Sequence, residues 1–258
     1  MSYALITGAS KGIGKEIAHQ LAMNGYDVLL VARNSYELQM VKEELEKKYP
    51  VQVDYLVSDL SEQGAVDRIV DWVETKQIDL RILVNNAGFG LVGKFDSYSF
   101  EENQKMMQVN VLAPVLLAQL LYRQQKSRAA DSSPNCDIPA VIQLLDQKLI
   151  TLNPDYFSYT LSKGALECAS QMMAMDFAPY LRVVGLAPGI SLPSGPQSED
   201  SFKAAHTMTP LKRSSTPIDI AKTAVFIAES NAITGTTIYV DGGQHLMPSS
   251  RDVMFKTK

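Results

Sequence analysis

The chain has 258 residues, of which 46% are hydrophobic, and a formal net charge of −4. This length and apolar content suit one domain with a large buried core. The acidic balance provides no excess of basic side chains to neutralise phosphates, which argues against nucleic acid or an anionic membrane surface as a partner.

The rare residue types also limit the class of protein. The two cysteines, Cys136 and Cys168, form no C-x-x-C pair, so we expect reduced thiols in a cytoplasmic protein. The N-terminus lacks the basic and apolar segments of a signal peptide, and no apolar run approaches the ~18 residues of a membrane span. The three histidines lie far apart, so no metal site is predicted. We expect a small-molecule ligand, with no nucleic acid and no membrane.

Short runs rich in Val, Ile and Leu alternate with helical patterns along the chain. The expected strands are residues 4–7, 27–31, 52–57, 82–85, 140–145, 181–186 and 237–240. The expected helices are residues 13–23, 35–49, 61–76, 110–125, 156–178 and 217–230. Apolar strands without alternation are typical of parallel strands that are covered on both faces. We therefore expect one α/β domain over residues 1–258, a Rossmann fold with a doubly wound, mostly parallel seven-stranded sheet and helices on both faces.

Two stretches interrupt this alternation. Residues 126–139 are polar and predict a surface loop. Residues 188–200 contain three prolines and two glycines, and they follow the carboxyl end of a strand, where open α/β sheets bind ligands. This position favours a mobile lid, and an ordinary surface loop is the alternative.

The first expected strand runs into a glycine-rich turn, residues 8–14. Glycines allow a tight turn in which backbone N–H groups approach a pyrophosphate, and the following helix presents its positive end to the same anion. A strand, this turn and a helix together predict dinucleotide binding. The candidate contacts in the turn are Gly8, Ser10, Lys11, Gly12, Ile13 and Gly14.

The end of the second strand indicates which dinucleotide is preferred. An NAD site usually has an acidic residue there to bind the ribose 2′-hydroxyl. This chain instead has Arg33, and Lys11 lies in the glycine turn. Because a guanidinium suits phosphate geometry, the pair favours the 2′-phosphate of NADP(H). A solvated arginine at a strand end is the alternative.

The second chemical signal is Tyr159 with Lys163. A spacing of four residues places both side chains on one face of a helix. A neighbouring ammonium is expected to lower the pKa of the phenol, so that the pair can pass a proton to a substrate while the cofactor passes a hydride.

Together these motifs make the chain resemble the short-chain dehydrogenase/reductase family over nearly its full length. The matching motifs are Thr7-Gly8-x-x-x-Gly12-Ile13-Gly14, Asp59-Leu60, Asn85-Asn86-Ala87-Gly88, Asn110, Tyr159-x-x-x-Lys163, Pro188-Gly189 and Val240-Asp241-Gly242-Gly243. The resemblance implies a cofactor half at about residues 1–110 and a catalytic half at about residues 111–258.

The resemblance also implies roles for single residues. Asn110 would hold a water in a relay to Lys163, which would also bind the nicotinamide ribose. The remaining implied cofactor contacts are Asp59 and Leu60 at the adenine, Asn85, Asn86, Ala87 and Gly88 along the cleft, and Pro188, Gly189 and Ile190 at the carboxamide.

One position departs from the family pattern. The family usually places a serine about 13 residues before the tyrosine to bind a substrate carbonyl, and this chain has Asp146 there. An ionised carboxylate repels a developing oxyanion, whereas a carboxyl group suits a substrate with basic ring nitrogens. A cap at the end of the strand, without chemistry, is the alternative.

An aspartate at this position resembles the pteridine reductase and dihydromonapterin reductase branch of the family, as does the surrounding second half. That branch reduces C=N bonds of dihydropterins and dihydrofolate with NADPH, and Asp146 and Tyr159 would handle protons at the pterin nitrogens. Phe89 is close to the place of an aromatic that stacks on the pterin, and core packing is its alternative. Gly12 stands where these reductases tend to have arginine.

The first half, to about residue 107, resembles general reductases of the family. A further hypothesis is therefore that the chain joins two branches of the family near residues 107–112. Three functions remain open: a pterin or dihydrofolate reductase, a general carbonyl or 3-oxoacyl reductase, and a cofactor-binding protein with little turnover. The resemblance also implies a homo-oligomer, a dimer or tetramer formed through the long helices.

Overall fold

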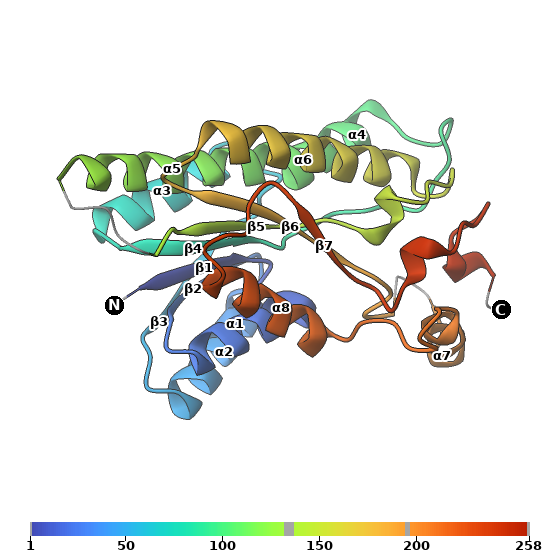
Figure 1. The fold of residues 1–258 in the computed structure, drawn as a ribbon, viewed down its shortest axis with the longest axis horizontal. Coiled ribbons are helices and arrows are strands. Elements are labelled where there is room, and N and C mark those ends of the chain that lie inside the picture. Colours follow the sequence, from blue (N-terminus) through green and yellow to red (C-terminus); the bar gives the residue numbers. More distant parts are fainter. Residues whose placement is uncertain (1, 132–136, 194–196, 257–258) are drawn as a thin grey trace.

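The computed structural model describes residues 2–131, 137–193 and 197–256. Within them, one parallel sheet has the order β3-β2-β1-β4-β5-β6-β7 (Figure 1). Its strands are β1 (Tyr3–Thr7), β2 (Asp27–Ala32), β3 (Val53–Val57), β4 (Leu80–Asn85), β5 (Ala140–Leu144), β6 (Arg182–Pro188) and β7 (Thr237–Val240). The predicted seven-stranded, doubly wound α/β fold is confirmed.

Helices cover both faces of the sheet (Figure 1). One layer contains α1 (Gly12–Met23), α2 (Ser35–Lys48) and α8 (Pro217–Glu229). The opposite layer contains α3 (Ala65–Thr75), α4 (Phe100–Met107), α5 (Ala113–Asp131) and α6 (Phe157–Asp176). Each layer encloses its own buried apolar cluster against one face of the sheet, as the unbroken apolar strands require.

The order of the strands places the site. The chain winds outward from β1 to β3 and then returns to β4 on the other side of β1. At such a reversal, the connections leave a crevice at the carboxyl ends of the strands. Thr7 ends β1 here, and its hydroxyl accepts hydrogen bonds from the backbone N–H groups of Asn86 and Ala87, which follow β4. The glycine turn is thereby joined to the segment after β4.

Several helical boundaries differ from those predicted. The helix expected at residues 110–125 is part of a longer stretch, in which α4, a π-helical turn η1 (Gln108–Leu112) and α5 follow one another. The loop expected at residues 126–139 is wrong for residues 126–131, because α5 continues to Asp131. Residues 132–136 of the expected loop lie outside the described residues.

Two helices were not expected from the sequence: α4, and α7 (Glu199–Thr207) within and beyond the expected lid. Each helix begins at an N-cap, a signal that the hydrophobic periodicity does not contain. Helix α4 has a capping box of Ser99 with Glu102, and α7 is capped by Ser198.

One helical stretch, residues Phe100–Ala129, is long and apolar enough to cross a membrane by length and composition. The expectation that no stretch resembles a membrane span is therefore wrong on those criteria. The apolar side chains have another cause, because 56% of the most apolar window is buried inside the protein, where α5 packs on β4, α3 and α6.

Candidate active site

Two adjoining hollows open at the carboxyl ends of the strands, and they share Ile13, Asn86, Gly88 and Leu192. The larger, which we call the cleft, has a volume of about 940 Å³ and lies along the glycine turn and the end of β2. The smaller, which we call the tyrosine pocket, has a volume of about 460 Å³ and contains Tyr159. A large open cleft beside a smaller pocket suits a dinucleotide next to a small substrate.

The glycine turn needs its glycines for conformation and for space. Gly8 and Gly12 have φ of +67° and +59°, in the left-handed region that side chains disfavour. A Cβ on Gly14 would lie 2.3 Å from the carbonyl oxygen of Gly8. The side-chain amide of Asn86 donates to the carbonyl oxygens of Thr7 and Gly8 at 2.9 and 3.2 Å. The turn is thus fixed with room for an anion beside its backbone.

The basic residues expected at a 2′-phosphate both line the cleft. Lys11 and Arg33 are exposed, and among the described residues Arg33 has no ion-pair or hydrogen-bond partner in the protein. Asp59 also lines the cleft, and its Oδ1 accepts hydrogen bonds from the Ser61 backbone and hydroxyl. Burial opposes the ionisation of Asp59, but these bonds and the nearby Arg33 outweigh it and lower its pKa. The cleft therefore has a free cation at the end of β2.

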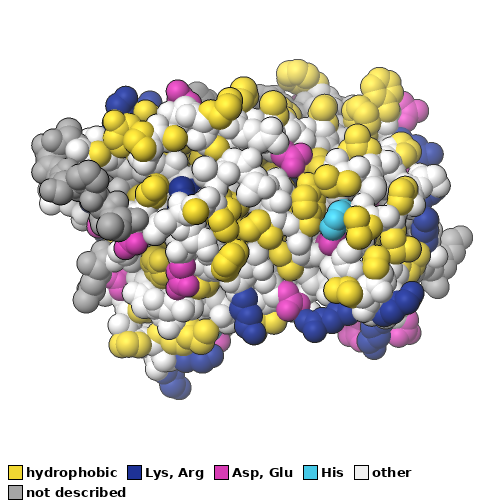
Figure 2. Space-filling model, in the orientation of Figure 1, with side chains coloured by type: hydrophobic (Ala, Val, Ile, Leu, Met, Phe, Trp, Pro, Cys, Tyr) yellow, Lys and Arg dark blue, Asp and Glu magenta, His cyan; other side chains and the backbone are white. Residues whose placement is uncertain are grey.

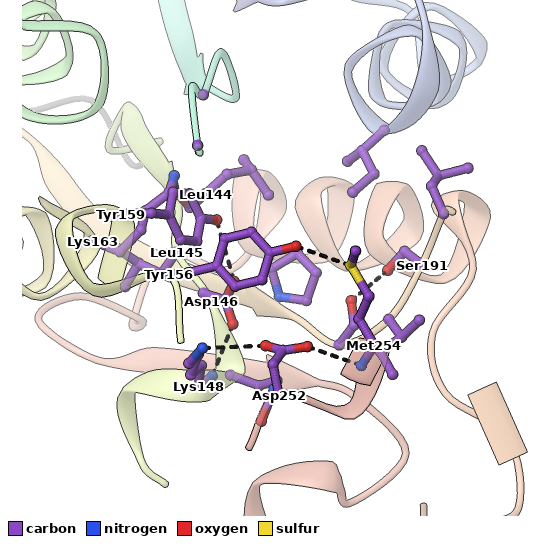
Figure 3. Close-up of a pocket in the computed structure, with 18 of the residues that line it drawn as sticks. Leu144, Leu145, Asp146, Lys148, Tyr156, Tyr159, Lys163, Ser191, Asp252 and Met254 are labelled. Atoms are coloured by element: carbon purple, nitrogen blue, oxygen red, sulfur yellow. Dashed lines mark hydrogen bonds and ion pairs between the residues drawn. The ribbon is translucent and has the colours of Figure 1, made fainter. Parts of the chain in front are cut away.

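Figure 3 shows the centre of the tyrosine pocket, where Tyr159 on α6 points toward Asp146 at the end of β5. The phenol of Tyr159 donates to Oδ2 of Asp146 at 3.2 Å, and the backbone N–H of Lys148 donates to Oδ1 at 2.9 Å. Burial raises the pKa of the Asp146 carboxyl, and the Lys148 bond and the Lys163 charge oppose that shift. The sequence predicted that Asp146 and Tyr159 share a site, and the structure brings them into contact.

Lys163 lies beside this pair, one helical turn after Tyr159. Its Nζ donates to the carbonyl oxygen of Leu144 at 2.6 Å and lies 5.8 Å from the centre of the Tyr159 ring. Burial lowers the pKa of Lys163 to about 8, and Asp146 partly offsets that shift. Lys163 thus titrates near physiological pH.

The expectation that Lys163 lowers the pKa of Tyr159 is wrong for this structure. Burial raises the pKa of the Tyr159 phenol well above its usual range, and the charge of Asp146 and the hydrogen bond to it add to the shift. The phenolate would be desolvated and would face a carboxylate, so the neutral phenol is favoured. The Tyr159 phenol is therefore protonated at neutral pH.

Asn110 lies in the π-helical turn η1 and is completely buried. Its side chain accepts from the backbone N–H of Phe89 at 2.8 Å, and it donates to the Phe89 carbonyl at 2.7 Å and to the Ser162 hydroxyl at 2.9 Å. A single π turn redirects side chains within a helix and is frequent at functional sites. Here it joins the segment after β4 to α6. The role of Asn110 in a water relay stays a prediction.

Two glycines after β4 bring the backbone close to Asn110, Lys163 and Tyr159. A Cβ on Gly88 would lie 3.8 Å from both Asn110 Oδ1 and Lys163 Nζ. A Cβ on Gly90 would lie 3.0 Å from the Tyr159 ring. Gly90 was not singled out from the sequence, although it lies two residues after the Asn-Asn-Ala-Gly motif.

Phe89 lines the cleft, whereas Asp146 and Tyr159 line the tyrosine pocket. The Lys105 ammonium lies 4.9 Å from the centre of the Phe89 ring, and the ring packs against the buried cluster under α5. This position matches the core-packing alternative more closely than a ring stacked on a substrate.

The other expected cofactor residues fall on the same two hollows. Gly8, Ser10, Gly12, Ile13, Leu60, Ala87 and Gly88 line the cleft, and Pro188, Gly189 and Ile190 line the tyrosine pocket. Gly14 and Asn85 line neither hollow; Gly14 supports the turn, and Asn85 is buried at the end of β4, where it donates to Pro114.

The expected lid follows β6. Its described residues 188–193 and Gln197 line the tyrosine pocket, while residues 194–196 lie outside the described residues. Ser191 shares a hydrogen bond of 2.6 Å with Ser215, and His206 Nδ1 lies 3.0 Å from the Ile190 carbonyl oxygen. Hydrogen bonds therefore attach the first residues of the expected lid to α7 and to the segment before α8.

The C-terminal tail forms a further wall that no sequence signal indicated. Asp252, Val253 and Met254 line the tyrosine pocket of their own chain. Buried Lys148 donates to the carbonyl oxygen of Asp155 at 2.6 Å and to Asp252 Oδ2 at 3.2 Å, and the Tyr156 hydroxyl donates to Met254 Sδ (Figure 3). In this chain the tail packs on its own site as far as residue 256. Residues 257–258 lie outside the described residues.

The comparisons with known proteins agree with this geometry. Residues 8–245 match the family model described as enoyl-(acyl carrier protein) reductase. Glucose 1-dehydrogenase from Gluconobacter oxydans is 30% identical over 93% of this chain and 90% of its own length. L-xylulose reductase from Caenorhabditis elegans is 29% identical over 93% of this chain and 94% of its own length.

A solved structure with the same fold is the FolM alternative dihydrofolate reductase 1 from Brucella canis, complexed with NADP. It is 30% identical, with a TM-score of 0.86, and the match covers 97% of this chain and 96% of that one. These relatives span both halves of the chain. The resemblance inferred from the motifs is thus confirmed: the chain belongs to the short-chain dehydrogenase/reductase family of oxidoreductases.

Proposed function

We propose that this protein is an NADPH-dependent reductase that acts on a C=N bond of a dihydropterin or dihydrofolate type of substrate. The observation that carries the proposal is the hydrogen bond between Tyr159 and Asp146, at the position where most of the family has a serine. The likeness to a dihydrofolate reductase crystallised with NADP supports it.

The cleft suits NADP(H) by its donor set. Backbone N–H groups of residues 8–14 would bind the pyrophosphate, and the exposed Arg33 and Lys11 would bind the 2′-phosphate. Lys163 would hold the nicotinamide ribose, and residues 188–190 would meet the carboxamide. Bound NADPH would supply the hydride.

The chain's own residues would handle the proton. Reduction of C=N adds a hydride to the carbon and a proton to the nitrogen. Tyr159 is neutral and can donate its phenolic proton to that nitrogen. Asp146, whose pKa is raised, orients the phenol and can exchange a proton with a second ring nitrogen. The Lys163 ammonium would then stabilise the phenolate until it is reprotonated.

A general carbonyl reductase is the second candidate, supported by the sugar and polyol dehydrogenases among the relatives. A substrate panel separates the two. NADPH oxidation is followed spectrophotometrically with dihydrobiopterin, dihydrofolate and several ketones. Turnover selective for the pterins supports the proposal, and ketone turnover without pterin turnover refutes it. NADPH binding without any turnover would support a cofactor binder.

We also propose that the protein forms a homo-oligomer through α5 and α6. Large apolar side chains are exposed along η1, α5 and α6, and Figure 2 shows hydrophobic side chains along the edge above these helices. They include Leu112, Leu116, Leu161, Met172 and Met175. Such a surface favours self-association. Light scattering of wild type and Leu161→Glu tests it: a larger wild-type species and a smaller variant are expected, and a wild-type monomer refutes it.

A further inference from the structure

Two glutamine side chains of the tyrosine pocket are unexplained by the proton chemistry. Gln147 begins the 3₁₀ turn η2 (Gln147–Leu149) directly after Asp146, and Gln244 begins the turn η3 (Gln244–Leu246) after β7. The two turns pack against each other, and both residues line the pocket that contains Asp146 and Tyr159. Two side-chain amides from distant parts of the catalytic half therefore lie in one wall of the tyrosine pocket.

Both amides have unused hydrogen-bonding capacity. Gln244 is 7% exposed. The Oε1 atoms of Gln147 and Gln244 are shut off from solvent and have no hydrogen-bond partner among the described residues. A buried amide atom without a partner costs stability, so it needs a reason. Gln143 is also unpaired, but it lies within β5 and lines neither hollow.

Backbone hydrogen bonds fix the positions of the two residues in the chain. The Gln244 N–H donates to the Asp241 carbonyl at 3.2 Å, and the preceding Gly243 N–H donates to Asp241 Oδ1 at 2.9 Å. Gln147 lies in the turn that Asp146 caps through the Lys148 N–H. The Asp146 carboxyl and Gln147 are thus adjacent on one turn, and Gln244 lies on the turn that packs against it.

We propose that Gln147 and Gln244 select the substrate by binding an edge of alternating N–H donors and C=O or C=N acceptors. A carboxamide offers both donor and acceptor, so it pairs with a cyclic amide or amidine. The 2-amino-4-oxopyrimidine ring of a pterin has such an edge. This inference rests on the proposed function and adds to it a pair of specificity-determining residues beside Asp146 and Tyr159. A ketone without that edge leaves the amides unpaired, which disfavours it.

The test compares Gln147→Met and Gln244→Met with Gln63→Met, which changes an exposed glutamine that lines neither hollow. Each variant is assayed with dihydrobiopterin and with 3,4-dihydroisoquinoline, a cyclic imine without an amide or amidine edge. We expect kcat/KM for dihydrobiopterin to fall about tenfold or more in both pocket variants, mainly through KM. The imine value should change less than about threefold, and Gln63→Met should match wild type for both substrates. Equal losses on both substrates, or no loss, would overturn the inference.

A binding experiment distinguishes failure of this inference from failure of the proposed function. Biopterin fluorescence is titrated with NADP⁺-loaded wild type and variants. If wild type turns over no pterin, the proposed function fails, but binding that is lost in the two pocket variants still supports the amides. Equal binding by wild type and variants overturns the inference even if pterin turnover is found. Where a methionine variant melts early, Gln→Asn withdraws the amide by one methylene and gives the same comparison.

Discussion

Replacing Asp146 by asparagine tests the electrostatics of the site with little change in shape. Asparagine keeps one side-chain oxygen, which can accept from the Tyr159 phenol or from the Lys148 N–H but not from both, and the negative charge is lost. A hydrogen bond to a charged group contributes about 1.5–3 kcal/mol, against about 0.5–1.5 for a neutral one. With the charge, a difference of about 1–2 kcal/mol is lost, and the pKa of Tyr159 should fall because the Asp146 charge is one of the causes that raise it.

The same substitution acts on Lys163 in a direction that a pH profile can detect. Burial lowers the pKa of Lys163 to about 8, and the Asp146 charge partly holds it up. The ammonium is present below this pKa and is lost as the pH rises through it. We expect kcat/KM for NADPH to decline above pH about 8 in wild type. In Asp146→Asn the decline should begin at lower pH, by on the order of one unit.

Asp252→Asn is the matched control for this profile. It also removes a carboxylate from the tyrosine pocket, but Asp252 does not contribute to the pKa shift of Lys163. Its alkaline limb should coincide with that of wild type. An alkaline limb of Asp146→Asn that stays at the wild-type pH, or moves upward, would refute the reasoning.

Three further substitutions address other parts of the site. Tyr159→Phe should abolish turnover and leave NADPH binding intact by fluorescence titration, since only the proton donor is lost; retained turnover would contradict that role. Arg33→Asp should raise the KM for NADPH above that for NADH, because a carboxylate repels the 2′-phosphate, and unchanged constants would remove Arg33 from that site. Gly14→Ala should weaken NADPH binding about tenfold or more by calorimetry, since its Cβ would lie 2.3 Å from the Gly8 carbonyl oxygen. Wild-type affinity would show that the turn tolerates the displacement.

The sheet was predictable because its strands are local apolar runs. β1 to β7 all lie within two residues of their expected ends, since strands buried on both faces leave an unbroken pattern. The helical layer over β4 was less predictable. The π turn at Gln108–Leu112 shifts the periodicity, so the start of the expected helix fell inside a longer one.

The site was predictable where one motif carries it. Tyr159 and Lys163 are four residues apart on α6, and Asp146 lies two residues after the end of β5, so chain order alone places them together. The pKa of Tyr159 was predicted in the wrong direction, because the contact with Asp146 and the burial are tertiary properties.

The wall made by the tail had no comparable signal. Lys148 and Asp252 are 104 residues apart, and their ion pair depends on how the tail packs. Gln244 is likewise far in sequence from β5 and Asp146. The join of two family branches near residues 107–112 stays a prediction, and relatives align across both sides of it.

The central claim is that Asp146 directs this oxidoreductase toward ring nitrogens. The most direct test is the ratio of kcat/KM for dihydrobiopterin to that for a ketone, in wild type and in Asp146→Ser, which restores the residue usual in the family. The account predicts a ratio that falls by about tenfold or more in the variant, through loss of pterin turnover. An equal loss on both substrates would contradict it and would leave Asp146 as a structural cap of β5.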